Sequence, residues 1–270
     1  MKKINILSIF GTRPEAIKMA PLCHELTKYA EFDAKIAVTG QHRQMLDQVL
    51  SVFQMTPDYD LDIMEKNQNL YSIVVRALER LEPVLKEAAP DLVLVHGDTS
   101  TAFIGALAAY YAKIPVGHVE AGLRTYDIYS PFPEEINRRL VAPIAALHFC
   151  PTEESRENLT RENITKNVFI TGNTAIDNVH LLASDHYTFR DAYVSKLDFS
   201  KRIIFMTAHR RENYGQPMEN IMHAVSDLVG KYPDVEVVYP VHLSPVVREV
   251  ANRILGEKPR VHLIEPLDFD

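Results

Sequence analysis

The sequence has few cysteines, no long apolar segment and no excess of positive charge, and each absence excludes a class of protein. The two cysteines, Cys23 and Cys150, lie far apart and form no C-x-x-C pair, so we interpret them as reduced core residues of a cytosolic protein. No run of about 18 apolar residues occurs, so we expect no segment to span a membrane. The 29 Lys and Arg against 36 Asp and Glu give a net charge of −7, which argues against a broad basic surface for nucleic acid or an anionic membrane.

Length and composition are those of a soluble globular protein. The 270 residues suggest about two domains, and the 46% apolar and 24% charged content exclude disorder and collagen-like repeats. The first residues hold a basic pair and a short apolar stretch, but they lack a small-residue cleavage site and run straight into Gly-Thr-Arg-Pro-Glu. We therefore expect a buried first strand there rather than a secretory signal.

Apolar runs alternate with amphipathic stretches along almost the whole chain. The runs are rich in Val and Ile and do not alternate with polar residues, which predicts a parallel sheet with helices on both faces and hence an α/β fold. The expected strands are 4–10, 33–39, 91–97, 115–120, 146–150, 168–171, 202–208, 235–241 and 261–265. The expected helices lie near 14–29, 44–54, 70–89, 101–113, 134–145, 152–162, 176–186, 217–231 and 245–256.

The turn-rich stretch 171–174 is the expected joint between two Rossmann-like domains. It divides the chain into 1–171 and 172–270. The second part holds three strong strands and stops just past the last of them, so it has the pattern of half a domain.

Ligands of a doubly wound sheet bind beyond the carboxyl ends of its strands, so the residues that follow each strand are the candidates for a functional site. Gly11 to Glu15 follow the first strand, and the start of the next helix beside Arg13 is a candidate anion site. A solvated arginine in a turn is the alternative. The sequence has no G-x-G-x-x-G and no G-K-[ST] loop, which argues against a tightly held dinucleotide or an ATPase.

Three further segments carry carboxylates at strand or helix ends. Asp98 follows the third of the strong strands and is either a catalytic group or a helix N-cap, although Thr99 or Ser100 can also cap that helix. Strand alternation places His118 and Glu120 on one side, which fits a buried pair or a catalytic carboxylate better than a metal site, because no further ligands are at hand.

The segment 130–139 opens a helix, with Glu134 and Glu135 in its first turn. For Glu135 we favour a purely structural role at the helix dipole. Arg138 lies one turn after Glu134 and either pairs with it or points its guanidinium toward the ligand.

A histidine followed by charged residues ends the first strand of the second part. His209 with Arg210, Arg211 and Glu212 has the pattern of an acid/base group beside a phosphate clamp. His242 is the other strand-end histidine. These residues predict a site for a phosphorylated or nucleotide-linked small molecule, and they leave the reaction open.

Taken together, eight segments resemble the UDP-N-acetylglucosamine 2-epimerase family in its bacterial, non-hydrolysing form. They run in family order over nearly the whole chain: GTRPEAIKMAPL (11–22), GQHRQMLDQVL (40–50), VHGDTSTAF (95–103), IPVGHVEAGLRT (114–125), SPFPEEINRRL (130–140), TGNTAID (171–177), TAHRREN (207–213) and YPVHLSPVVRE (239–249).

The resemblance implies two facing Rossmann-like lobes of the B-type glycosyltransferase kind, with the second lobe incomplete here. It implies that UDP-GlcNAc and UDP-ManNAc are interconverted through elimination of UDP to 2-acetamidoglucal, without metal or nicotinamide, in a cytoplasmic homodimer that serves surface-polysaccharide synthesis. Asp98, Glu120 and Glu134 match the carboxylates that move the C2 proton and support the cationic transition state. His209 matches the histidine at the leaving UDP phosphate.

The remaining matches concern the diphosphate and a regulatory site. Arg13 and Arg138 match arginines near the diphosphate, and Arg210 and Glu212 are assigned to substrate binding with them. The resemblance also implies a second, activating UDP-GlcNAc site, matched by Gln41, Gln44 and His242 together with Glu134 and Arg210. Asn67 stands where members with this site usually carry an arginine, which argues against activation by substrate here.

Family members continue past a segment like LIEPLDFD, so we expect a C-terminally truncated epimerase with an uncovered sheet edge and weak or no turnover by these 270 residues alone. The alternatives are a B-type glycosyltransferase, a hydrolysing relative that releases free ManNAc, and a non-catalytic nucleotide-sugar-binding fragment.

Overall fold

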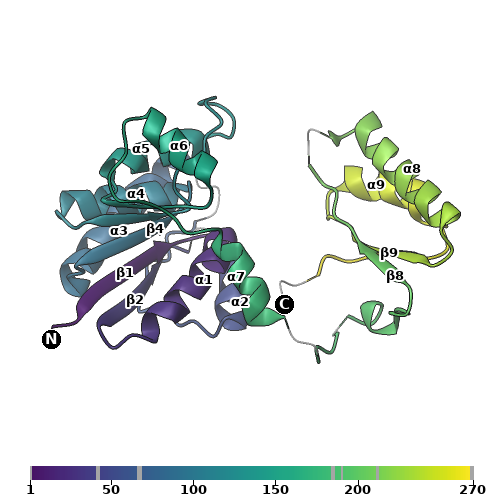
Figure 1. Cartoon of the computed structure of the whole chain (residues 1–270), viewed down its shortest axis with the longest axis horizontal. Coiled ribbons are helices and arrows are strands. Elements are labelled where there is room, and N and C mark those ends of the chain that lie inside the picture. Colours follow the sequence, from purple (N-terminus) through teal and green to yellow (C-terminus); the bar gives the residue numbers. More distant parts are fainter. Residues whose placement is uncertain are drawn as a thin grey trace. The chain divides into compact units, whose positions relative to one another are not determined.

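The chain forms two compact α/β units, residues 1–183 and 184–270, and each is described by itself. The computed structural model (Figure 1) describes residues 2–40, 43–65, 69–183, 186–189, 191–210 and 213–267, apart from the side chain of Gln44. Within these ranges, no helix is both long enough and apolar enough to cross a membrane.

The first unit is a parallel sheet of seven strands in the order β3-β2-β1-β4-β5-β6-β7. The first six positions follow the order 3-2-1-4-5-6 of a dinucleotide-binding fold, with the switch point between β1 and β4. The strands are β1 (Ile4–Phe10), β2 (Phe32–Val38), β3 (Tyr59–Asp60), β4 (Leu92–His96), β5 (Val116–Val119), β6 (Leu147–Cys150) and β7 (Val168–Ile170). The helices are α1 (Arg13–Thr27), α2 (Arg43–Val52), α3 (Leu70–Ala88), α4 (Ser100–Tyr111), α5 (Glu134–Ile144), α6 (Glu153–Arg161) and α7 (Thr174–Leu182).

Both faces of this sheet are covered, which explains why its strands read as continuous apolar runs. Alternate residues of β1 enter opposite cores, as strand geometry requires. Leu7 and Ile9 pack in the cluster that includes α3, α4 and α5, whereas Ile6 and Phe10 pack in the cluster that includes α1 and α2 (Figure 1).

The second unit has a parallel sheet of three strands in the order β10-β9-β8. Its elements are η1 (Val194–Lys196), β8 (Arg202–Phe205), α8 (Gln216–Lys231), β9 (Val235–Pro240), α9 (Pro245–Leu255) and β10 (Val261–Ile264). Helices α8 and α9 cover one face, where Met222, Tyr239 and Val247 are fully buried.

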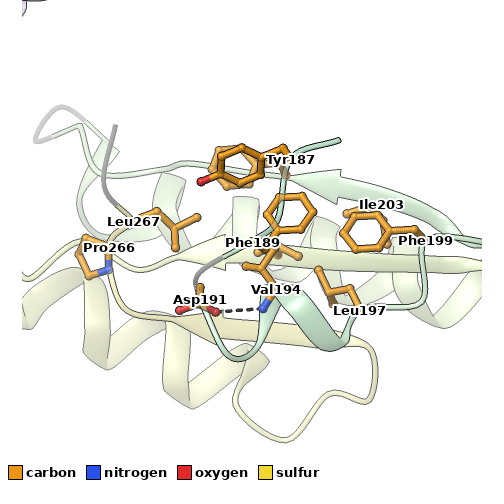
Figure 2. Close-up of a pocket in the computed structure, with 11 residues that line it drawn as sticks. Tyr187, Phe189, Asp191, Val194, Leu197, Phe199, Ile203, Pro266 and Leu267 are labelled. Carbon is orange, nitrogen blue, oxygen red and sulfur yellow. Dashed lines mark hydrogen bonds between the residues drawn. The ribbon is translucent and has the colours of Figure 1, made fainter. Parts of the chain in front are cut away.

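The other face of this small sheet carries an apolar groove of about 470 Å³ (Figure 2). Phe189 and Phe199 stack with ring centroids 5.2 Å apart, and the Asp191 carboxylate accepts the Val194 N–H at 2.9 Å. The groove is lined by Tyr187, Phe189, Asp191, Val194, Leu197, Phe199, Ile203, Phe205, Val238, Pro266 and Leu267.

All nine predicted strands and all nine predicted helices are confirmed, most of them within two residues at each end. The two elements that the pattern did not predict, β3 and η1, have two and three residues, too few to show a period. The two units divide after Ala183 rather than at residue 171. The difference arises because α7 belongs to the first unit, where Asn178 donates to the backbone oxygen of Ile17 at 2.5 Å.

Within the described residues, β8 is paired on one side only, by β9, and it ends in Phe205, which is 64% exposed. An apolar strand edge of this kind promotes association between chains. We expect Phe205→Lys to reduce concentration-dependent association of this chain, measured as weight-average mass by analytical ultracentrifugation. Leu243→Lys, a change of an equally exposed residue in the loop after β9, is the control. Equal association of the two variants would show that the exposed edge of β8 does not promote association.

Candidate functional site

The carboxyl ends of β1 and β4 flank the switch point of the first sheet, where an open α/β sheet binds its ligands. Two short loops lead from these ends into α1 and α4. Two of the predicted residues lie here, Asp98 in the loop before α4 and Arg13 at the first position of α1. The topology therefore places them at one edge of the sheet.

Glu15 shapes the first of these loops. Its buried carboxylate accepts the N–H groups of Gly11 and Thr12 at 3.0 and 2.8 Å and the hydroxyl of Thr99 at 2.6 Å. Burial raises the pKa of Glu15, and these hydrogen bonds act in the opposite direction. Arg13 is left exposed at the start of α1, followed by Pro14, as expected for an anion-binding helix start. The role of Glu15 was missed, although the spacing Thr-x-x-Glu is the signal of a capping box.

Asp98 is not the N-cap of α4, which was one of the two roles predicted for it. Thr99 is the N-cap of α4 and accepts the Ala102 N–H at 3.0 Å. The Asp98 side chain is 29% exposed and lies 3.3 Å from Nη1 of Arg138. Burial raises the pKa of Asp98, with Arg138 opposing and the charges of Glu134 and Glu120 adding to the rise. The charges of the other two predicted carboxylates, Glu134 and Glu120, thus reach Asp98.

Glu120 is the most constrained member of this cluster. Its backbone has φ of 60°, a left-handed conformation that a non-glycine residue adopts at a cost of about 1–3 kcal/mol and that is concentrated at functional sites. Its side chain is 11% exposed, and both carboxylate oxygens accept hydrogen bonds from Nζ of Lys18, at 2.7 and 2.6 Å. Asn173 adds a longer contact of 3.4 Å to Oε2.

The predicted pairing of His118 with Glu120 by strand alternation is corrected by the structure. Strand β5 ends at Val119, and the left-handed backbone of Glu120 breaks the alternation. His118 is fully buried and its Nε2 contacts the backbone oxygen of Gly97 at 2.7 Å. In the described part of the chain, no group of three or more His, Cys, Asp or Glu side chains is arranged to hold a metal ion.

The first turn of α5 carries Glu134 and Glu135, and the second of them is a structural residue. Glu135 is fully buried and accepts the N–H groups of Thr125 and Tyr126, both at 3.0 Å, which gives it the structural role that we favoured. Burial alone would raise its pKa, but these bonds and Arg138 bring the pKa of Glu135 below its ordinary value. Arg138 pairs with Glu135 at 2.5 Å and with Asp98 at 3.3 Å. Pairing with Glu134 was one of the two alternatives predicted for it.

In the second unit, His209 and His242 come together. Their rings stack with centroids 5.1 Å apart and an interplanar angle of 18°, and both residues are exposed. Nδ1 of His242 accepts the Ser244 N–H at 3.0 Å. Arg210 follows His209 and is also exposed. The family resemblance implies different sites for the two histidines, whereas in the structure they form one pair after the ends of β8 and β9.

Several predicted residues lie outside the described part of the chain. They are Gln41, Asn67, Arg211 and Glu212, together with the side chain of Gln44.

Reasoning from residue types missed Lys18, Asn173 and His96, which surround Glu120. Lys18 has both polar and apolar neighbours in sequence, so its pattern is typical of a solvent-exposed lysine on a helix. The only signal that could have found it is its position in the segment GTRPEAIKMAPL.

Two buried histidines of this region tie stability to pH. Burial lowers the pKa of His96 to about 3 and that of His118 to about 4, whereas both titrate near 6.5 in the unfolded chain. Below pH 6.5 the unfolded chain therefore binds more protons, so stability is complete above that pH and falls as the pH drops toward 4. Each ring contributes a slope of up to about 1.4 kcal/mol per pH unit.

We expect His118→Gln, which keeps a donor for the Gly97 oxygen, to remove one of these two contributions. Urea unfolding of wild type and variant at pH 7, 6 and 5 measures the slope. Equal slopes would show that His118 does not carry this dependence.

A doubly wound sheet with paired acids and cations at its switch point has the architecture of an enzyme site for a small anionic molecule. Residues 24–270 match the model of the family described as UDP-N-acetylglucosamine 2-epimerase. The chain is 55% identical over 269 residues to the UDP-N-acetylglucosamine 2-epimerase of Bacillus subtilis (strain 168), covering 99% of this chain and 70% of that protein. It is 53% identical over 274 residues to the one of Escherichia coli (strain K12), covering 98% and 73%.

A solved structure agrees with these sequence relationships. UDP-GlcNAc 2-epimerase from Neisseria meningitidis, solved with UDP-GlcNAc bound, superposes with a TM-score of 0.80 at 44% identity, over 98% of this chain and 73% of that one. This chain belongs to the UDP-N-acetylglucosamine 2-epimerase family, which confirms the resemblance stated from the sequence. It spans about 70% of the length of the Bacillus subtilis relative.

Proposed function

We propose that this chain is a UDP-N-acetylglucosamine 2-epimerase, an isomerase that interconverts UDP-GlcNAc and UDP-ManNAc by eliminating UDP and adding it back to the other face of 2-acetamidoglucal. Family membership supports the activity. The observation that carries the mechanism is the cluster of Asp98, Glu120 and Glu134 at the switch point, with Lys18 and Arg138 as its cations.

The chemistry requires such a mixture of charges. No carbonyl group adjoins C2 to acidify its proton, so the diphosphate must begin to leave first and generate an oxocarbenium-like ring. Negative groups stabilise that ring and accept the proton, while positive groups stabilise the departing diphosphate. Protonation on either face of C2 requires more than one acid/base group.

The environments of the two best-placed carboxylates suggest different roles. Both carboxylate oxygens of Glu120 accept hydrogen bonds from Nζ of Lys18, which fixes the carboxylate in place, and Glu120 is assigned as the acceptor of the C2 proton. Burial raises the pKa of Asp98, which suits it to hold and return a proton. Neighbouring carboxylates with unlike environments are the usual arrangement for separate base and acid. Glu134 adds negative charge that supports the cationic ring.

The diphosphate is proposed to contact Arg13 at the start of α1, Arg138, and His209 with Arg210 after β8. Glu212 is proposed to bind substrate as well. A histidine can supply a proton to the departing phosphate near neutral pH. The stacked His209–His242 pair supports a shared role in binding phosphate, and it favours substrate contact for His242 over a purely regulatory one.

The homodimer, the cytoplasmic location, the role in surface-polysaccharide synthesis and the activating UDP-GlcNAc site with Gln41 and Gln44 remain proposals that rest on the family resemblance alone. Light scattering with and without UDP-GlcNAc tests the first of them. A rate that rises more steeply than hyperbolically with UDP-GlcNAc would support the activating site, which Asn67 argues against.

Incubation of the chain with UDP-GlcNAc in D₂O tests the activity. We expect UDP-ManNAc to form and the C2 proton of both sugars to be replaced by deuterium, followed by proton NMR. A B-type glycosyltransferase leaves C2 protonated, and a hydrolysing relative releases free ManNAc. The rate of UDP-ManNAc formation in the same assay tests the prediction that these 270 residues show weak or no turnover. Binding of UDP-GlcNAc by calorimetry with neither exchange nor UDP-ManNAc would leave a non-catalytic binder and refute the proposal.

A further inference from the structure

His96 is a buried histidine with an unsatisfied ring nitrogen that faces the acid cluster. It is the last residue of β4 and is 3% exposed. Its Nε2 has no hydrogen-bond partner within the described residues and lies 3.9 Å from Oε2 of Glu120. Buried polar atoms without a partner are rare in folded proteins and cost about 1–3 kcal/mol, so an exception calls for a reason.

The ring of His96 is neutral at physiological pH. Burial lowers its pKa to about 3, and the positive charge of Lys18 acts in the same direction. A neutral imidazole carries one proton, on either Nδ1 or Nε2. A lone pair on Nε2 would face the negative carboxylate of Glu120 and be repelled, whereas an N–H there is attracted. The geometry therefore favours the tautomer with the proton on Nε2.

The two oxygens of Glu120 have unequal surroundings. Oε2 faces Nζ of Lys18 at 2.6 Å, Nδ2 of Asn173 at 3.4 Å and Nε2 of His96 at 3.9 Å. Within the described residues, Oε1 accepts a hydrogen bond from Lys18 alone, at 2.7 Å. Oε2 thus has Asn173 as a second donor and the His96 ring nitrogen nearby, beyond hydrogen-bond distance, whereas more of the lone-pair capacity of Oε1 is open.

We propose that His96 is a positioning residue that holds Oε2 of Glu120, so that Oε1 is the oxygen that accepts the C2 proton. This inference rests on the proposed function for the identity of the proton. His96 keeps its own proton throughout and touches no substrate. A neutral donor orients the carboxylate without adding a second positive charge, which would weaken the base.

Nitrogen NMR of the imidazole rings in the chain tests the arrangement without any turnover. We expect His96 in the Nε2–H tautomer at pH 7, and we expect Glu120→Gln to shift its Nε2 resonance because the facing charge is removed. His118, whose Nε2 contacts the Gly97 oxygen, is the internal control and should shift much less. A proton on Nδ1 of His96, or a resonance unaffected by Glu120→Gln, would overturn the proposal.

Two substitutions then separate positioning from a role in packing alone. His96→Gln keeps an N–H donor near the position of Nε2, and we expect its kcat to stay within about 5-fold of wild type. His96→Leu keeps the apolar packing but has no donor, and we expect kcat to fall by about 10- to 100-fold with KM within about 2-fold, because misplacing a reacting group by about 1 Å costs up to about 100-fold. Equal losses in both variants, accompanied by equal losses in Tm, would refute the positioning role. If wild type shows no epimerisation, the proposed function fails, and the NMR result still decides the state of His96.

Discussion

Replacing Glu120 with glutamine is expected to lower kcat for epimerisation by about 100- to 10,000-fold, the range that a positioned acid/base group contributes. The substitution keeps the size of the side chain and its hydrogen-bonding oxygen but removes the charge that is proposed to accept the C2 proton. The rate of UDP-ManNAc formation and the rate of deuterium entry at C2 should fall together, since both depend on the same proton transfer. Proton NMR of one reaction mixture measures both rates.

The matched control is Glu25→Gln, which makes the same exchange on the same unit and also breaks a Lys–Glu pair, the exposed Lys28–Glu25 contact on α1. It should leave kcat unchanged. A Glu120→Gln variant that retains more than about a tenth of wild-type kcat would remove Glu120 from the proton transfer, and the base would then have to be Asp98 or Glu134.

Replacing Lys18 with methionine is expected to lower both stability and activity, because it leaves Glu120 charged and only 11% exposed without its cation. Breaking one side of a largely buried ion pair costs several kcal/mol, and partial exposure reduces this to about 1–3 kcal/mol here. The double variant Lys18→Met, Glu120→Gln removes both charges. We therefore expect it to be more stable than the sum of the two single changes predicts.

Urea unfolding of the four proteins in this cycle gives the coupling free energy directly. Lys28→Met removes the cation of the exposed pair on α1 and should change the unfolding midpoint little. Additive effects of the two changes at Lys18 and Glu120 would mean that the 2.6 Å contact carries no net stabilisation. In that case an activity loss in Lys18→Met would have to arise from the substrate rather than from Glu120.

The elements of the fold could be predicted from the sequence because each leaves a local pattern. Strand β1 has the predicted bounds, 4–10, since residues 6–10 are buried between two helical layers and give the segment its largely apolar character. Strand β3 could not be predicted, because two residues carry no period. The assignment of α7 to the first unit depends on contacts such as that of Asn178 with Ile17, which lie 161 positions apart in the chain.

The site was predictable only as a set of strand-end residues. Asp98 and Glu120 were found because the carboxyl ends of parallel strands meet at one edge. Lys18 was not, because its contact with Glu120 joins residues 102 positions apart and its own helix gives it no distinguishing pattern. The pairing of Arg138 with Glu135 was not among the two alternatives predicted for Arg138, for a related reason. Helix spacing allows both i,i+3 and i,i+4 pairs, and burial of Glu135 decides between them.

The carboxylate of Glu15 has a consequence for the energetics of the reaction. It accepts hydrogen bonds from the loop after β1 and from Thr99 beside Asp98, so two loops from neighbouring strands share one buried acceptor. Dipoles and charges fixed in this way are already oriented before charge develops in the transition state. If the proposed site binds the sugar here, little reorganisation energy is required of these two loops, and that saving is the largest single source of rate enhancement in many enzymes.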